Sequence, residues 1–361
     1  MAVDCKTQAV ALTPDGHPDK PGRLSNLGNA YRKLFDQLGE IQHLHMAIDC
    51  MAQSFMLIPD NHPHKPTYLN NLAITYQTLF DRLGELQHIH LAVDCQTQAV
   101  VLTPDGHPDK PGRLSNLGNA YRKLFNQLGE IQHLHMAINC MAQSFMLIPD
   151  NHPDTPSFLS NLGDAYQELF DQLGELRHLH MALDCRARAV ALTPEVDPLG
   201  AYCLANLGHS YLSLFSTSHE PEHLARSKLY CQCAALSPAG IPKHRLWGAR
   251  HWARLSVLDG SDALEAYTHC MLRLPEAVWL GTSLQRRFEC LTPRIQAVIS
   301  EAAVAAILAS RYDLAVEWLE QGRCLVWSQM LQLRTPLDSL HASYPELANE
   351  LHRLSSWLED T

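Results

Sequence analysis

One pattern, repeated every 45 residues, constrains this fold more than any other feature of the sequence. An Asp-Cys pair begins at residues 4, 49, 94 and 184, and an Asn-Cys pair begins at residue 139. A longer period of 90 residues is superimposed, because residues 4–48 and 94–138 differ at only three positions. Repeats of roughly 20–50 residues are typical of solenoids, in which each unit buries its apolar face against the next. The sequence therefore predicts a linear stack of similar units.

Each repeat carries the pattern of two amphipathic helices. In the first repeat, apolar residues recur at helical spacing over residues 24–38, and Gly39 follows where a left-handed C-terminal cap favours glycine. A second helix is predicted over about 40–57. The turn-forming run Pro-Asp-Gly-His-Pro-Asp-Lys-Pro, at 14–21 and again at 104–111, separates the repeats. The predicted N-caps of the first helices that follow these two runs are Asp19 and Asp109.

The first helices resemble those of the tetratricopeptide repeat (TPR) family. The family pattern is a bulky residue, two variable residues, Leu-Gly, two variable residues and Tyr. It stands in four repeats, and in the second repeat Ala73 replaces the glycine. The matching residues are Leu24, Leu27, Gly28 and Tyr31; Leu114, Leu117, Gly118 and Tyr121; Leu159, Leu162, Gly163 and Tyr166; and Leu204, Leu207, Gly208 and Tyr211.

The 45-residue period is longer than the usual TPR of about 34 residues and is similar to the long repeats of kinesin light chains. The resemblance implies an all-α fold, a right-handed TPR-type α-solenoid built as a superhelix of helical hairpins, over residues 1–239. Residues 1–5 align with residues 46–50 of a second helix. The first repeat is therefore predicted to be incomplete, as in a fragment or a truncated gene model.

The C-terminal third has a different composition, with all six tryptophans beyond residue 240. Helical patterns continue at about 244–258, 262–273, 293–309 and 312–334, and near 345–358. Residues 240–361, in particular Glu-Trp-Leu-Glu-Gln-Gly-Arg at 317–323, resemble the TPR region that precedes the CHAT domain in large fungal proteins. CHAT domains are caspase-like, so the resemblance implies a protease-like domain downstream of this chain. No catalytic motif of that domain is present, and the chain itself is not predicted to be an enzyme.

Charge and composition narrow the compartment and the partners. With 28 Lys+Arg against 38 Asp+Glu, the net charge is −10, and no basic run predicts a nucleic-acid partner. The longest apolar stretch, 302–309, is far shorter than the ~20 residues that cross a bilayer. No signal peptide is recognisable, and eleven cysteines fit reduced thiols better than a disulfide framework. These features predict a cytoplasmic protein without a membrane partner.

Repeated histidines and cysteines suggest metal or redox chemistry, but their spacing argues against both. Each second helix carries His-x-His, and residues two apart on a helix point to nearly opposite sides. One histidine of each pair is predicted to pack and the other to be solvated. Equivalent cysteines lie on helices separated by an intervening helix, too far apart for a disulfide. No cofactor and no metal ligand is predicted. The histidine pairs are His43/His45, His88/His90, His133/His135 and His178/His180.

A polar set on the first helices is the candidate binding site. In TPR arrays the first helices line a concave groove, and here the residue before Leu-Gly or Leu-Ala is always asparagine. An asparagine side chain has both the donor and the acceptor that an extended peptide backbone needs. The charged positions that follow become acidic in the fourth repeat, at Asp164 and Glu168, so the groove is predicted to change sign. The predicted peptide-binding residues are Asn26, Asn29, Arg32, Lys33, Asn71, Asn116, Asn119, Arg122, Lys123, Asn161 and Asn206.

Three functions remain open from the sequence. The leading prediction is a protein- or peptide-binding scaffold, the regulatory or sensing region of a CHAT-type protein, with intramolecular contact to the downstream domain as a further possibility. The alternative is a self-assembly module without a groove ligand. A metal-dependent enzyme would need a stoichiometric ion. The asparagines also have a purely structural interpretation, in which they bond neighbouring helices.

Overall fold

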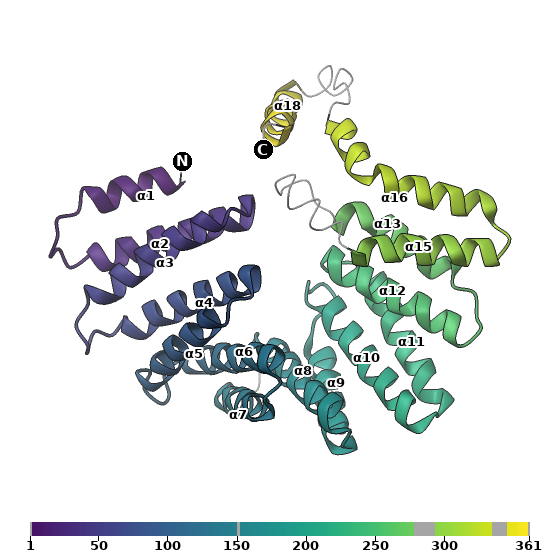
Figure 1. Cartoon of the computed structure of the whole chain (residues 1–361), viewed down its shortest axis with the longest axis horizontal. Helices are drawn as coiled ribbons and strands as arrows, with labels where there is room; N and C mark the ends of the chain where they lie inside the picture. Colours follow the sequence, from purple (N-terminus) through teal and green to yellow (C-terminus); the bar gives the residue numbers. More distant parts are fainter. Residues whose placement is uncertain (1, 150–151, 278–292, 334–344, 360–361) are drawn as a thin grey trace. The chain divides into compact units, whose positions relative to one another are not determined.

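The computed structural model describes residues 2–149, 152–277, 293–333 and 345–359 (Figure 1). Within these ranges the chain forms sixteen helices and no β-strand, which confirms the predicted all-α fold. Contacts divide the chain into two compact units, residues 1–192 and residues 193–361. The predicted change of region near residue 240 stays a prediction.

Unit 1 is a stack of helical hairpins. Each first helix packs against the second helix of its own repeat, and each second helix packs against the first helix of the next. The unit begins with a lone second helix that packs on the first complete hairpin. The helices are α1 (Ala2–Ala11), α2 (Lys20–Leu38), α3 (Ile41–Met56), α4 (Lys65–Leu83), α5 (Leu86–Val101), α6 (Lys110–Leu128), α7 (Ile131–Leu147), α8 (Thr155–Leu173) and α9 (Leu176–Leu192).

The ends of the first helices follow the sequence signals, with one correction. α2 has proline in its first turn and ends at Gly39, whose φ of 79° is left-handed as predicted. Asp19 occupies the N-cap position, but its side chain makes no capping hydrogen bond. Its backbone N–H instead donates to His17 Nδ1 at 3.1 Å. The equivalent Asp109 likewise does not cap, because its carboxylate accepts from Arg113 at 2.9 Å.

Apolar side chains join the hairpins into a continuous core. Phe35 on α2, Leu44 on α3 and Leu79 on α4 form one buried cluster that spans two repeats. Burying a side chain of this size stabilises the fold by roughly 1.5–3 kcal/mol. The helices of a hairpin approach closely at Gly28, where a Cβ atom would lie 2.7 Å from Met51 Cγ. The glycine of the TPR pattern is therefore required by packing between α2 and α3.

Unit 2 continues with helical hairpins of more varied sequence. Its largest cluster contains Trp252, Tyr267 and Trp318. Arg250 and Arg254 both donate to Glu301 Oε1, at 2.8 and 2.6 Å, and so link α12 to α15. The predicted region 240–361 also includes residues 278–292 and 334–344, which lie outside the described residues. The helices are α10 (Gly200–Ser218), α11 (Pro221–Leu236), α12 (Pro242–Leu258), α13 (Leu264–Ala277), α15 (Pro293–Leu308), α16 (Tyr312–Leu333) and α18 (Pro345–Glu359).

Across the described ranges, no helix combines the length and apolarity that a membrane span requires.

Candidate functional site

The candidate site in unit 1 is the surface formed by α2, α4, α6 and α8, called here the first-helix face. Along this face α2 contacts α4, α4 contacts α6 and α6 contacts α8, whereas successive second helices contact each other less. The first helices therefore lie on the inner side of the stack within unit 1, as expected for a TPR array.

The asparagines of this face differ in their surroundings. Asn26 is exposed, and Asn71, Asn116 and Asn161 are half-buried. Asn116 Nδ2 donates to Asn70 Oδ1 on α4 at 3.0 Å. Asn161 Nδ2 donates to Ser115 Oγ on α6 at 3.3 Å. Two of the amides thus join successive first helices, and the role of the set in peptide contact stays a prediction.

Asn206 is more buried than the four asparagines of unit 1. Asn206, on α10 of unit 2, is only 6% exposed.

The sequence analysis missed the residues that accept hydrogen bonds from the asparagine side chains, although a signal was present. The residue before each asparagine in unit 1 is polar, and a small polar residue at that position is suited to accept from the asparagine of the next repeat. These residues are Ser25, Asn70, Ser115 and Ser160.

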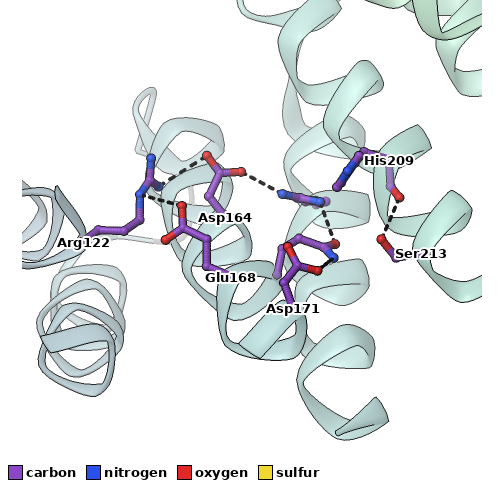
Figure 2. A network of polar contacts seen from close by, with 8 residues as sticks. Arg122, Asp164, Glu168, Asp171, His209 and Ser213 are labelled. Carbon is purple, nitrogen blue, oxygen red and sulfur yellow. Dashed lines mark hydrogen bonds and ion pairs between the residues drawn. The ribbon is translucent and has the colours of Figure 1, made fainter. Parts of the chain in front are cut away.

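The predicted cations on α6 are paired within the protein. Arg122 Nη1 lies 3.4 Å from Asp164 Oδ2, and Arg122 Nε lies 3.4 Å from Glu168 Oε1, both on α8 (Figure 2). Lys123 Nζ lies 2.5 Å from Asp81 Oδ2 on α4. The acidic groups of the fourth repeat therefore lie against Arg122 of the third, whereas Lys123 pairs with the second repeat. Asn119, one turn before Arg122, is half-buried.

A second arginine, which the sequence analysis missed, extends this network from α8 to α9. Arg186 on α9 is 4% exposed, and its Nη2 donates to Asp164 Oδ1 at 2.9 Å. Its Nη1 donates to Gln167 Oε1 at 3.1 Å, and Gln167 Nε2 donates to Asp171 Oδ1 at 3.0 Å. Asp164 and Asp171 both lie on α8 (Figure 2). A signal was available, because the equivalent position in the other complete second helices of unit 1 is Met51, Gln96 or Met141.

The network shifts the protonation of one of its carboxyl groups. Burial raises the pKa of Glu168 to about 7, Arg122 opposes the shift and Asp164 adds to it. A carboxyl group with a pKa near 7 is only partly ionised at neutral pH. Glu168 is therefore a weaker counterion for Arg122 than its distance alone suggests.

The corresponding groups on α2 and α4 are not paired in the same way. Among the described residues, Asn29 Oδ1, Arg32 Nη1 and Gln77 Nε2 are buried atoms without a hydrogen-bond partner. Burial lowers the pKa of Arg32, and Asp36 acts in the opposite direction. Lys33 is exposed. Buried polar atoms without a hydrogen bond therefore occur on α2 and α4, and also on α8 at Glu168 Oε2.

The repeated histidines have structural roles. His43 stacks on Tyr31 with ring centroids 6.5 Å apart, and its Nδ1 lies 3.6 Å from Glu40 Oε2. The same Tyr–His–Glu arrangement recurs in the second and third repeats. The first histidine of each pair is buried or half-buried and the second is exposed, as predicted. In the described ranges, no three His, Cys, Asp or Glu side chains lie close enough to hold a metal ion.

The four repeated cysteines that follow Cys5 are at least partly buried. Cys50, Cys95 and Cys140 are half-buried, Cys185 is buried, and all four are free. Burial raises the pKa of Cys95, Cys140 and Cys185 to about 11. Thiols with such a pKa are protonated at neutral pH and are poor nucleophiles.

Comparisons with known proteins identify the fold. The sequence matches no family profile, and no curated protein is significantly similar to it. The apo form of the quorum sensor NprR from B. thuringiensis matches with a TM-score of 0.55 at 12% identity, covering 90% of this chain and 80% of that one. A putative kinesin light chain from Podosopora anserina with nearly identical TPR-like repeats matches at 0.45 and 16% identity, covering 61% and 99%. BtubC (BKLC) from P. vanneervenii matches at 0.45 and 16% identity, covering 64% and 87%. Together with the helical hairpins described above, the NprR match shows that this chain has the fold of a TPR-type α-solenoid.

Proposed function

We propose that this chain is a non-enzymatic scaffold whose first-helix face binds an extended peptide of a protein partner. The observation that carries the proposal is a set of side-chain amides on this face that are exposed or lack a hydrogen bond within the described residues. Asn26 is exposed, and Asn29 Oδ1 and Gln77 Nε2 are buried atoms without a hydrogen-bond partner among the described residues. An extended peptide backbone offers N–H and C=O groups that complement such amides.

Peptides selected from a random dodecapeptide display library on the immobilised chain test this proposal. We expect Asn26→Ala combined with Asn71→Ala to weaken the selected peptides by about tenfold, because each lost hydrogen bond costs roughly 0.5–1.5 kcal/mol. Asn116→Ala is the matched control for the structural interpretation, since it breaks the bond to Asn70. It is expected to lower the thermal midpoint more than Asn26→Ala does. Selected peptides that bind the Asn26→Ala/Asn71→Ala variant with unchanged affinity would contradict the proposal.

The resemblance of residues 317–323 to the region before CHAT domains supports a narrower proposal. In it, the scaffold is the cytoplasmic regulatory region of a fungal CHAT-type protein, and its partner includes the downstream caspase-like domain. Sequencing the genomic region that follows the codon for Thr361 tests this directly. A stop codon, or an unrelated domain, would refute it.

Self-assembly is the second candidate, and one observation favours it. Each complete second helix of unit 1 exposes an apolar side chain at the same position, every 45 residues, which is a regular apolar row outside the first-helix face. The row consists of Met46, Leu91, Met136 and Met181, each 42–45% exposed. Sedimentation velocity across a concentration series distinguishes the two functions. Association that is unaffected by a saturating selected peptide, and abolished by Leu91→Lys with Met136→Lys, would favour assembly.

A further inference from the structure

The segments that precede α2, α4, α6 and α8, called here the linkers, each contain a His-Pro pair. Proline has no N–H, so the first backbone N–H after each histidine belongs to the residue two positions later. In all four linkers that N–H donates to Nδ1 of the histidine ring, at 3.1–3.2 Å. These residues, called here the linker histidines, are His17, His62, His107 and His152.

The segment before α10 in unit 2 makes the same bond with a different side chain. Its equivalent residue is Asp197, which is also followed by proline. Asp197 Oδ1 accepts from the backbone N–H of Leu199 at 2.8 Å. A side-chain acceptor for this N–H is thus kept at five equivalent positions, although the residue type changes. The chemistry differs, because a carboxylate accepts hydrogen bonds at any pH near neutral, whereas an imidazole nitrogen stops accepting once it is protonated.

The hydrogen bond defines the protonation state of each linker histidine. A ring nitrogen accepts an N–H only when it carries no proton itself, so the neutral ring holds its proton on Nε2. A second proton would occupy Nδ1 and bring two donors face to face. Histidine side chains ordinarily gain this proton between about pH 8 and pH 5. The folded linker therefore favours the neutral ring, and its bond is lost as the pH falls through this range.

The charges around the first two linker histidines add to this effect. His17 and His62 line one cavity of about 280 Å³, together with Lys20. The other lining residues are glycine, prolines, leucine and isoleucine, which carry no charge. Lys20 Nζ is already paired with Asp15 Oδ1 at 3.3 Å. Protonation of both rings therefore places two like charges around one small space, where they repel each other.

Two linkers offer a carboxylate to the protonated ring. Asp19 Oδ2 lies 3.9 Å from His17 Nδ1, and Asp154 Oδ2 lies 3.9 Å from His152 Nδ1. These distances are too long for hydrogen bonds, so a protonated ring must turn to reach the carboxylate. Turning exchanges the bond to the backbone for a bond between side chains. The backbone N–H of the linker then loses its acceptor.

The other two linkers offer no such exchange. The His62 ring lies beside the His64 ring, with centroids 5.5 Å apart, so a second titrating group faces it. Next to His107, the Asp109 carboxylate accepts from Arg113 at 2.9 Å and is already engaged. The nearby charged groups of these linkers form pairs of their own, which are Asp60 with Lys65 and Asp105 with Lys110.

We propose that the linker histidines make the junctions between the repeats of unit 1 sensitive to pH, because protonation removes the acceptor that holds each linker in its turn. The junction before α10, where Asp197 is the acceptor, does not share this sensitivity. The proposal concerns the linkers rather than the first-helix face. It therefore goes beyond peptide binding and does not depend on it.

NMR of the unmodified full chain tests the proposal directly. The ¹⁵N signals of the linker histidine rings are expected to show an unprotonated Nδ1 and a protonated Nε2 at about pH 8. As the pH falls to about 5, the amide ¹H signals that receive these rings should move upfield, and the Leu199 amide should stay in place. The opposite ring tautomer, or amide shifts no larger than that of Leu199, would overturn the proposal. The amides to follow belong to Asp19, His64, Asp109 and Asp154.

Variants with a neutral acceptor provide the second test. Asparagine in place of all four linker histidines keeps an oxygen for the same N–H and does not titrate. The matched control removes four exposed histidines from the second helices instead. The linker variant is His17→Asn, His62→Asn, His107→Asn and His152→Asn, and the control is His45→Gln, His90→Gln, His135→Gln and His180→Gln.

The urea midpoint of each chain is measured between about pH 8 and pH 5. The linker variant is expected to lose less of its midpoint than the parent as the pH falls, whereas the control should follow the parent. Glu168 is present in all three chains, so its own pH effect cancels in the comparison. Equal losses in the parent and the linker variant would overturn the proposal. If the fourfold variant does not fold, His62→Asn alone replaces it, with the pH response of the His64 amide signal as the measurement.

Discussion

The two halves of unit 1 are near copies that differ in how their polar groups are partnered. In the α6–α8–α9 half, two arginines, one glutamine and three carboxylates form a network, in which Glu168 Oε2 makes no hydrogen bond among the described residues. In the α2–α4–α5 half, the equivalent polar atoms are buried without hydrogen bonds among the described residues. The substitutions that change the partners of these groups include Ile74 for Asp164, Thr78 for Glu168, Gln96 for Arg186 and Asp36 for Asn126.

The difference teaches that duplication preserves the scaffold while a few positions decide what each segment of the face does. The apolar pattern of α2 is unchanged in α6, so both helices bury the same face. The network links α6, α8 and α9 internally, whereas the equivalent groups of the other half include buried atoms without a hydrogen bond among the described residues. Polar groups are satisfied either internally or by a ligand. The network of the α6–α8–α9 half is therefore expected to contribute more to stability, and the α2–α4–α5 half more to binding.

The largest loss of stability is expected from replacing Arg186, the most buried charged residue of the network on α6, α8 and α9. Arg186→Met copies the residue found at Met51 and Met141, and leaves Asp164 without its shortest ion pair, at 2.9 Å. Removing one partner of a buried ion pair typically costs about 3–5 kcal/mol. Urea unfolding followed by circular dichroism measures the loss of stability.

The control for Arg186→Met restores the composition of the α2–α4–α5 half. Arg186→Gln with Asp164→Ile reproduces Gln96 and Ile74, so no buried carboxylate is left unpaired. This double variant is expected to lose less stability than Arg186→Met. If the double variant were the less stable of the two, the ion pair would not be the source of the effect.

The pH dependence of stability provides a second, smaller test of the same half. The pKa of Glu168 is raised from an ordinary value near 4.5 to about 7 in the folded chain. The folded state therefore binds more protons than the unfolded state between these values, and stability falls as the pH rises through this window. The fall attributable to Glu168 is at most about 3 kcal/mol, since one pKa unit corresponds to roughly 1.4 kcal/mol.

Glu168→Gln is expected to flatten this pH dependence. The amide is neutral throughout, so the variant should lose less stability than the parent chain between about pH 4.5 and pH 7. Thr78→Gln, at the equivalent position of the α2–α4–α5 half, is the matched control and should leave the slope unchanged. Parallel curves of unfolding free energy against pH for the parent and Glu168→Gln would show that Glu168 does not titrate in this window.

Much of the fold could be predicted from the sequence because its signals are local. Helical periodicity, the turn run at 14–21 and Gly39 define hairpins whose ends agree with α2 and α3 within about two residues. Asp19 occupies the N-cap position as predicted, but the capping hydrogen bond expected of its side chain is absent. The His17 ring accepts the backbone N–H of Asp19, and the Asp19 side chain makes no bond to the helix.

The candidate site could be predicted only in part, because pairing across helices is not a local property. The sequence places Arg32 and Arg122 in nearly identical helices, which differ at Asp36 and its equivalent Asn126. Their different partners come from α4 and α8, which a one-helix pattern does not contain. Arg186 was missed for the same reason, since its partners lie on another helix about twenty residues away in sequence.

The smallest effect on stability is expected at two lysines, Lys33 and Lys123, which occupy equivalent positions in the two halves. Lys123 pairs with Asp81 on the preceding first helix, whereas α2 has no complete repeat before it within this chain. Exposed ion pairs contribute about 0–1 kcal/mol, so Lys123→Ala should lower the unfolding free energy by a few tenths of a kcal/mol, and Lys33→Ala by less. Raising the salt concentration should remove the difference, because the pair is partly exposed and is screened. Equal losses for the two variants at low salt would mean that the Lys123–Asp81 pair does not stabilise the stack.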